Sequence, residues 1–349
     1  AATNLCLQSE DLGTTWVSNF TSLQQASTQE TPDGDTSSKT IKLVDTSAQT
    51  VGEVYVFQGI TVAEDTKYTA SVFLKADQLS FASLRVGGYD GVISGSQFFG
   101  LSGAGSLGTA SNLDDSSIES YPNGWYRCSV TWIQGQGDTS FTFFILVADS
   151  ITNAVVTRDG TNSIFVWGAQ VEAGPIATSY IPTSGSAGTR NADDITLGSA
   201  SSLIGQAEGT LYVEVDWQAT DGVDQVLFEV SDASSNNKVT IFNDDSNDEL
   251  RMLANANNVA VTDQGVSSTS LTGIQKFAFA YKTNDFELYR NGSSVSNDSS
   301  GNFTVSSALT DVDLGQDQNA GTQANMWIRA VALFTTRLSD AECQALTTV

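Results

Sequence analysis

Short runs of alternating apolar and polar residues recur along this chain, and they constrain its fold more than any other feature. Residues 68–75 and 210–217 each place an apolar side chain at every second position. A period of two is typical of a β-strand with one buried face. Dipeptides that favour tight turns, such as Asn123-Gly124 and Asn291-Gly292, separate the runs. Many short strands with frequent turns predict an all-β fold of two antiparallel β-sandwiches (jelly rolls).

The chain has 349 residues, which is enough for two sandwiches of ordinary size. Small polar residues dominate from about 183 to 205 and interrupt the strand pattern, so we predict an exposed linker there. The expected domains are residues 1–195 and 196–349. One short C-terminal helix is predicted, because Ser339 and Glu342 have the spacing of a capping box.

The composition excludes several classes of function. The chain has no histidine, which removes serine–histidine and cysteine–histidine nucleophile pairs and histidine metal ligands. Acidic residues number 40 and basic residues 15, and the net charge of −25 repels nucleic acid and anionic membrane surfaces. No stretch approaches the roughly 18 apolar residues of a membrane span. We therefore expect no nucleic-acid partner and no membrane insertion.

Three cysteines lie far apart in the sequence, at Cys6, Cys128 and Cys343. They have neither the spacing of a zinc site nor the even number of a disulfide framework. We expect each of them to be a small, buried, apolar side chain.

The first domain begins and ends with sequence motifs that resemble those of a known module. Residues 4–12 with Trp16 resemble the opening of a bacteriophage module, and residues 165–174 with 178–183 resemble its closing motif, GAQxExG…TSYIPT. The module is a jelly roll similar to carbohydrate-binding modules, and it occurs in tail fibres and other virion surface proteins. The resemblance implies an extracellular location on a virion surface, with other virion proteins as partners. Such fibres are commonly trimeric, so a homotrimer is one expected state, although no heptad repeat supports a coiled coil.

The second domain carries two stretches that resemble a concanavalin A-like sandwich of the laminin G or pentraxin type. Residues 287–292 match the strand and turn of a characteristic hairpin, and residues 327–334 with 338–342 match the last strand and closing helix. The resemblance implies a lectin-like fold. It says little about a ligand, because such sandwiches also occur in enzymes and spacers.

Aromatic side chains are the expected contacts for a sugar, because a pyranose ring stacks on a flat ring. Four rings lie outside the strongest core patterns and are our candidates for glycan binding: Tyr89, Phe98, Phe99 and Tyr121. Packing in the core remains the alternative for each ring. Four tryptophans at motif positions are expected in the core: Trp16, Trp125, Trp167 and Trp327.

An acidic stretch between two expected strands offers oxygen ligands suited to calcium. The candidate ligands are Asn243, Asp245, Asn247 and Asp248. The stretch lacks the glycine and glutamate of an EF-hand loop, so a plain hairpin turn remains the alternative. Asp311, Asp313 and Asp317 form a second acidic patch of the same kind.

Glu214 and Asp216 lie two apart on an expected strand and share a face, as a pair of glycosidase carboxylates would. No third acidic residue follows them, so we expect solvent-facing acids and no catalysis.

The expected function is therefore that of a non-enzymatic virion surface protein, such as a tail fibre, head fibre or capsid decoration, that binds a host-surface glycan. The strong negative charge favours a neutral glycan, or an anionic glycan bridged by calcium. Two alternatives remain open: a purely structural virion module, and an accessory domain of a secreted polysaccharide-degrading enzyme.

Overall fold

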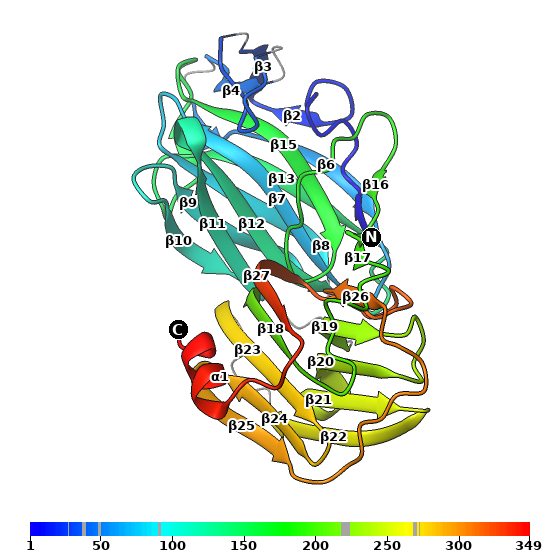
Figure 1. Ribbon diagram of the computed structural model, residues 1–349. Coiled ribbons are helices and arrows are strands. Elements are labelled where there is room, and N and C mark those ends of the chain that lie inside the picture. The colour runs from blue at the N-terminus through cyan, green and yellow to red at the C-terminus, as the bar shows by residue number, and fades with distance from the viewer. Residues whose placement is uncertain are drawn as a thin grey trace. The chain divides into compact units, whose positions relative to one another are not determined.

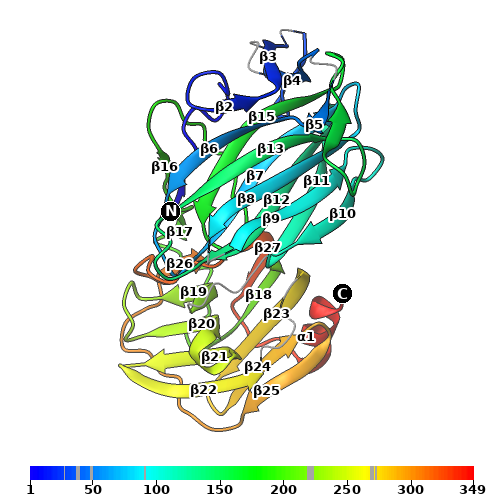
Figure 2. The same ribbon diagram turned by 180° about the vertical axis from the view of Figure 1, so that it is seen from behind.

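The chain folds into two compact units, Ala1–Asn191 and Ala192–Val349. The structure is a computed structural model. It describes residues 1–26, 28–36, 40–47, 50–89, 92–217, 224–267, 271 and 273–349, with the backbone alone for residues 89, 92 and 93. Figures 1 and 2 show strands throughout both units.

The first unit contains two six-stranded sheets. The strands of one sheet are β2 (Val17–Asn19), β6 (Tyr55–Thr61), β8 (Phe81–Tyr89), β9 (Val92–Gly100), β10 (Ser106–Ser111) and β13 (Ser140–Ala148), in the order β10-β9-β8-β13-β6-β2. The strands of the other are β3 (Thr21–Gln25), β4 (Ile41–Asp45), β7 (Thr66–Ala76), β11 (Asp115–Tyr121), β12 (Trp125–Gln134) and β15 (Ser163–Ala173), in the order β11-β12-β7-β15-β4-β3. Two short pairs complete the unit, β1 (Ala2–Asn4) with β16 (Gly188–Arg190) and β5 (Val51–Glu53) with β14 (Val155–Thr157).

The inner faces of these two sheets form one hydrophobic core. Val72 and Val166 enter it from one sheet, and Leu84 and Phe143 enter it from the other. The alternation seen in the sequence explains this packing, because every second side chain of a strand points to the same face. The remaining side chains of the sheet that holds β7 and β15 form an outer face, which carries the candidate site.

A buried asparagine ties the N-terminus to the last long strand of the unit. The Asn4 amide donates to the carbonyl oxygens of Ala169 (3.1 Å) and Ile181 (2.8 Å). Its carbonyl oxygen accepts from the backbone N–H groups of Cys6 and Val171, both at 3.0 Å. Asn4 has no exposed surface, so all four hydrogen bonds are sheltered from water. The opening and closing motifs of the sequence therefore meet at one side chain.

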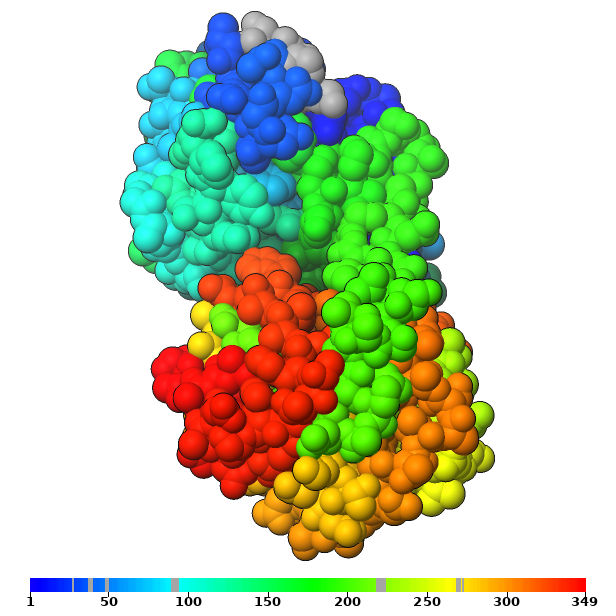
Figure 3. Space-filling view, viewed as in Figure 1, coloured from blue at the N-terminus to red at the C-terminus, as the bar shows by residue number. Residues whose placement is uncertain are grey.

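The expected linker, residues 183–205, is partly structured and is divided between the two units. The hydroxyl of Thr183 donates to the carbonyl of Cys6, and the strand β16 pairs with β1. Figure 3 shows the chain after β15, in green, at the surface of the unit. The division falls after Asn191, ahead of the expected 195, because Ile195 already pairs with Leu314 of the second unit.

The second unit contains a six-stranded and a five-stranded sheet. The strands of the first are β17 (Ile195–Leu197), β19 (Gln225–Ser231), β20 (Lys238–Asp244), β21 (Glu249–Ala256), β22 (Val259–Ser267) and β26 (Asp311–Leu314), in the order β17-β26-β19-β20-β21-β22. The strands of the second are β18 (Glu208–Trp217), β23 (Gly273–Lys282), β24 (Asp285–Arg290), β25 (Ser293–Asp298) and β27 (Met326–Phe334), in the order β25-β24-β23-β18-β27.

The core of the second unit is sandwiched between its two sheets. Val213 and Phe277 of the five-stranded sheet pack with Ile241 and Met252 of the six-stranded sheet. A single α-helix, α1 (Asp340–Thr347), follows β27, and its Cys343 packs on the outer face of the five-stranded sheet.

The predicted all-β architecture of two antiparallel sandwiches with one short C-terminal helix is confirmed. Every strand pair in the described ranges is antiparallel, and Ser339 forms the predicted capping box with Glu342. The predicted burial of the three cysteines, all of them free, is also confirmed. Among the residues that the structure describes, we find no helix long and apolar enough to cross a membrane.

Replacing Asn4 with alanine should lower the free energy of unfolding of the first unit by at least about 3 kcal/mol, because each buried polar group left unpaired costs about 1–3 kcal/mol. Urea unfolding followed by tryptophan fluorescence measures this loss. Asn191→Ala is the control, since Asn191 is exposed and its replacement should change the free energy of unfolding by less than about 0.5 kcal/mol. Equal stabilities of the two variants would contradict the role given to Asn4.

Candidate functional site

One row of side chains crosses the outer face of the sheet that holds β7 and β15. Residues in register on neighbouring strands point to the same side, so the pairing of the strands orders the row. It runs Gln24 (β3), Lys42 (β4), Phe165 (β15), Lys75 (β7), Trp125 (β12) and Tyr121 (β11). We call these six residues the outer row. The row combines aromatic rings, amines and an amide from six separate strands.

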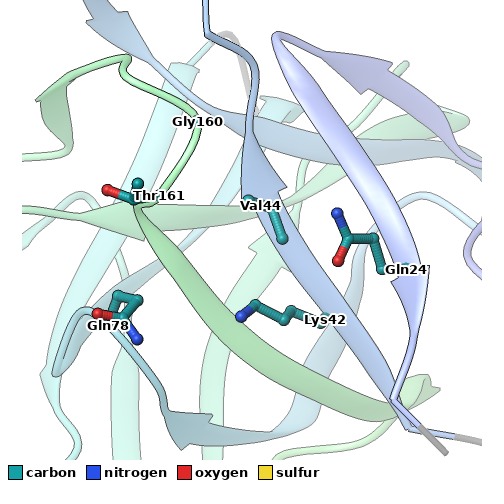
Figure 4. Close-up of a pocket in the computed structure, with 6 residues that line it drawn as sticks. All are labelled: Gln24, Lys42, Val44, Gln78, Gly160 and Thr161. Atoms are coloured by element: carbon teal, nitrogen blue, oxygen red, sulfur yellow. The ribbon is translucent and has the colours of Figure 1, made fainter.

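A pocket of about 410 Å³ lies at the β3–β4 end of the outer row. Its lining residues are Gln24, Lys42, Val44, Gln78, Gly160 and Thr161, drawn in Figure 4. This volume falls within the range of small-ligand sites. The polar groups around it are two amides, one ammonium and one hydroxyl, which together can donate and accept hydrogen bonds.

The two glutamine amides of the pocket are available to a ligand. Gln24 and Gln78 are both exposed, and among the described residues their side chains have no hydrogen-bond partner. Thr161 is also exposed, although its hydroxyl donates to Asp159 at 2.7 Å. Ligand groups could therefore bind the amides without breaking an existing contact.

Lys42 is held in place from two sides. Its ammonium lies 2.6 Å from the Asp77 carboxylate and 6.0 Å from the centre of the Phe165 ring. Burial opposes ionisation of Asp77, but hydrogen bonds from Lys42 and Ser163 outweigh it and lower the pKa of this carboxyl. The ion pair is therefore formed at neutral pH, and it positions Lys42 at the wall of the pocket (Figure 4).

The Tyr121 end of the row is packed with aromatic rings. Tyr121 meets Phe73 edge-on, with ring centres 5.0 Å apart, and Phe73 also contacts Trp167 and Tyr180. Trp125 is fully buried there, and its indole donates to the carbonyl of Glu30 at 2.9 Å. This end is an outer hydrophobic cluster in which Tyr121 is only partly exposed.

The structure separates the other predicted glycan-binding rings from Tyr121. Phe99 is fully buried in the main core, which excludes it as an exposed platform. Phe98 is half-buried on β9, which belongs to the opposite sheet of the sandwich. Tyr89 ends β8, and its side chain lies outside the described part of the chain. The three described rings, Phe98, Phe99 and Tyr121, do not form one site.

Sequence reasoning missed most of the outer row. Gln24, Lys42, Phe165 and Lys75 lie on strands that are far apart in the sequence, and only the strand order brings them together. The alternation marks each of them as facing away from the core, but it carries no information about which outward residues become neighbours.

The four predicted calcium ligands lie in and beside the turn between β20 and β21. Asn243 lies on β20 with 1% of its surface exposed, and its amide has no hydrogen-bond partner among the described residues. Asp245 and Asn247 lie in a 3-10 turn that Asp244 caps, and Asp248 follows in a left-handed conformation with φ of 52°. Within the described ranges, no group of three or more cysteine or acidic side chains is placed to hold a metal. Calcium at this hairpin stays a prediction.

The prediction that Trp327 lies in the core is wrong. Trp327 is 58% exposed, whereas Trp16, Trp125 and Trp167 are buried as expected. β27 is an edge strand, and its inward residues Met326 and Ile328 leave Trp327 on the outer side.

Glu214, on the strand that also carries Asp216, forms ion pairs. Glu214 lies 3.1 Å from Arg329 and 3.8 Å from Lys276, and it accepts a hydrogen bond from the Tyr212 hydroxyl at 3.4 Å. These contacts give Glu214 a structural partner on each neighbouring strand.

The second acidic patch surrounds one buried carboxyl. Asp313 is 4% exposed, and in the part of the chain that the structure describes one of its carboxylate oxygens has no hydrogen-bond partner. It lies in register with Glu229, which is itself buried and paired with Lys238 at 2.9 Å. Burial raises the pKa of Asp313 to about 6, and the charges of Glu229, Asp311, Asp194 and Asp317 add to this effect.

Comparisons with known proteins give no family. No family model matches the chain, and no curated protein matches it. Among solved structures, a carbohydrate-binding module (CBM40) of a Ruminococcus gnavus sialidase is 14% identical, covers 45% of this chain and 97% of its own, and has a TM-score of 0.36. Domains LG4-5 of the mouse laminin α1 chain are 9% identical, with 79% and 84% covered and a TM-score of 0.29. A Trypanosoma rangeli sialidase is 12% identical, with 88% and 60% covered and a TM-score of 0.36. With identities and TM-scores this low, the similarities carry no argument about function.

Asp313→Asn should stabilise the second unit at pH 7 and have little effect at pH 4. The folded-state pKa of about 6 lies above the ordinary value of 3.8, so the stabilising contribution of protonated Asp313 is lost as pH rises through about 6. Calorimetry at both pH values measures the difference in Tm. The exposed Asp248 serves for a control variant, Asp248→Asn. An equal effect of Asp313→Asn at both pH values would contradict this account of Asp313.

Proposed function

We propose that this chain is a non-enzymatic adhesion protein of a virion surface, such as a tail fibre, head fibre or capsid decoration. Its ligand in this proposal is a host-surface glycan, bound at the pocket and the adjoining outer row of the first unit. The observation that carries the proposal is a pair of amides in one pocket, Gln24 and Gln78, whose side chains have no hydrogen-bond partner within the described ranges. Lys42 and Thr161 lie beside them.

The chemistry of the pocket suits a sugar. A glycan presents many hydroxyl groups, each of which both donates and accepts hydrogen bonds, and amides match them in both directions. The half-buried ring of Phe165 beside Lys42 adds an apolar surface of the kind on which a pyranose ring packs. A site this open should bind weakly, roughly between millimolar and micromolar, and gain strength from many copies on a particle.

The virion location rests on the resemblance of residues 4–12 and 165–183 to a phage surface module. In this proposal, other virion proteins hold the chain on the particle, and a homotrimer is one arrangement that would multiply the sites.

The absence of catalysis is part of the same proposal. It is supported by the lack of histidine and by the ion pairs that engage Glu214 with Arg329 and Lys276. No third acidic residue follows this pair on its strand.

Gln24→Ala and Gln78→Ala should each weaken glycan binding about five-fold, because each removes a hydrogen bond worth about 1 kcal/mol. Binding is measured on a glycan array and then by calorimetry with the strongest hit. Gln25→Ala is a matched control, since Gln25 is an exposed neighbour on the same strand that points to the opposite side.

Loss of binding in all three variants, or in none, would contradict the placement of the site. An array on which the wild-type protein binds no glycan would favour the purely structural module.

Hydrolysis of polysaccharides by the Glu214→Gln and Asp216→Asn variants should not differ from that by the wild-type protein. A reducing-sugar assay on host polysaccharide measures this. Hydrolysis by the wild type that disappears in either variant would overturn the non-enzymatic assignment and favour the enzyme-associated alternative.

A further inference from the structure

Lys75 occupies the middle of the outer row. It lies on β7, in register with Phe165 of β15 on one side and Trp125 of β12 on the other. Its side chain is half-buried. Lysine stems pack along aromatic surfaces and leave the ammonium group at the surface. The ammonium of Lys75 is therefore presented between two aromatic positions of the face.

The charge environment of Lys75 is unusual for this protein. The chain has 40 acidic and 15 basic residues, so carboxylates outnumber the basic side chains that could form ion pairs with them. Lys42 pairs with Asp77, Lys67 with Asp114 and Arg85 with Glu53. In the part of the chain that the structure describes, Lys75 is the one lysine or arginine with neither an ion pair nor a hydrogen bond.

Several carboxylates lie on the same side of the sheet, and two of them have described partners. Asp77 is bound to Lys42, and Glu30 accepts from the Asn123 amide at 3.1 Å. Arg127 also lies on this face, 5.4 Å from the centre of the Phe73 ring, and it donates to the Ser71 hydroxyl. Glu119, in register with Arg127, and Glu172 also face this side, so the face carries both signs of charge. Lys75 supplies the ammonium group on it that is not engaged by any described residue.

We propose that the glycan bound at this face is acidic, and that a carboxylate or sulfate group of one sugar residue binds the ammonium of Lys75. This inference rests on the glycan-binding function proposed above. Adjacent strands lie about 4.8 Å apart, so Lys75 is roughly 10 Å from Lys42, two strands away. An oligosaccharide anchored at Lys75 can then pass the ring of Phe165 and reach the pocket at Lys42 and Gln24.

The inference departs from the neutral glycan expected from the sequence. That expectation assumes that the net charge of the whole protein determines the electrostatic potential at every point of its surface. At physiological salt, charges more than about 8 Å apart are largely screened, so an approaching carboxylate responds mainly to charges within that distance, among them the ammonium of Lys75. Calcium is not required as a bridge.

The experiment is a glycan array that carries neutral, carboxylated and sulfated glycans, probed with the full chain in EDTA. We expect the bound set to be acidic, and its chemistry distinguishes carboxylate from sulfate. Lys75→Ala should weaken binding of the strongest hit about ten-fold, and Lys75→Arg should retain most of it. Lys67→Ala is the matched control, because Lys67 projects from the same face of the same strand at its far end.

The outcomes separate the two claims. Binding to neutral glycans, or equal binding of a hit and its carboxyl-reduced or desulfated form, would overturn the inference and leave the glycan-binding function standing. Unchanged affinity in Lys75→Ala would overturn it as well. Binding of the wild-type protein to no glycan at all would overturn the proposed function together with the inference.

Discussion

The first unit depends on the hydrogen bonds of one buried amide. Asn4 uses both donors and both lone pairs of its side chain, and every partner is a backbone group. A buried backbone group without a partner is costly, so this side chain fixes the N-terminal segment against β15. Since β15 also carries Phe165, the same contacts support the outer row that we propose as the binding face.

This arrangement gives the opening and closing motifs of the first unit a structural role. Gln170 accepts from the backbone of Ile181, and Glu172 accepts from the backbone and hydroxyl of Thr178. These residues stabilise the turn of the chain after β15. Their role is structural, and the pocket residues Gln24 and Gln78 lie outside both motifs. The motifs therefore stabilise the fold, and the residues that line the pocket lie outside them.

Much of the fold could be predicted from local sequence. The alternation of residues 68–75 predicted β7, and the spacing of Ser339 and Glu342 predicted α1, because both signals involve residues close together in the chain. The binding face could not be predicted in the same way. Lys42, Phe165 and Lys75 become neighbours through the register of three strands, which depends on long-range pairing. The exposure of Trp327 could not be predicted from local sequence either, because it depends on the position of β27 at the edge of its sheet.

The most direct test of the account is hydrogen–deuterium exchange of the full chain with and without the strongest-binding glycan of an array. If the outer face of the first unit is the binding site, protection should increase in peptides that contain β3, β4 and residues 77–80, with no change in the second unit. Protection confined to the second unit, or to the opposite sheet around Phe98, would contradict the account.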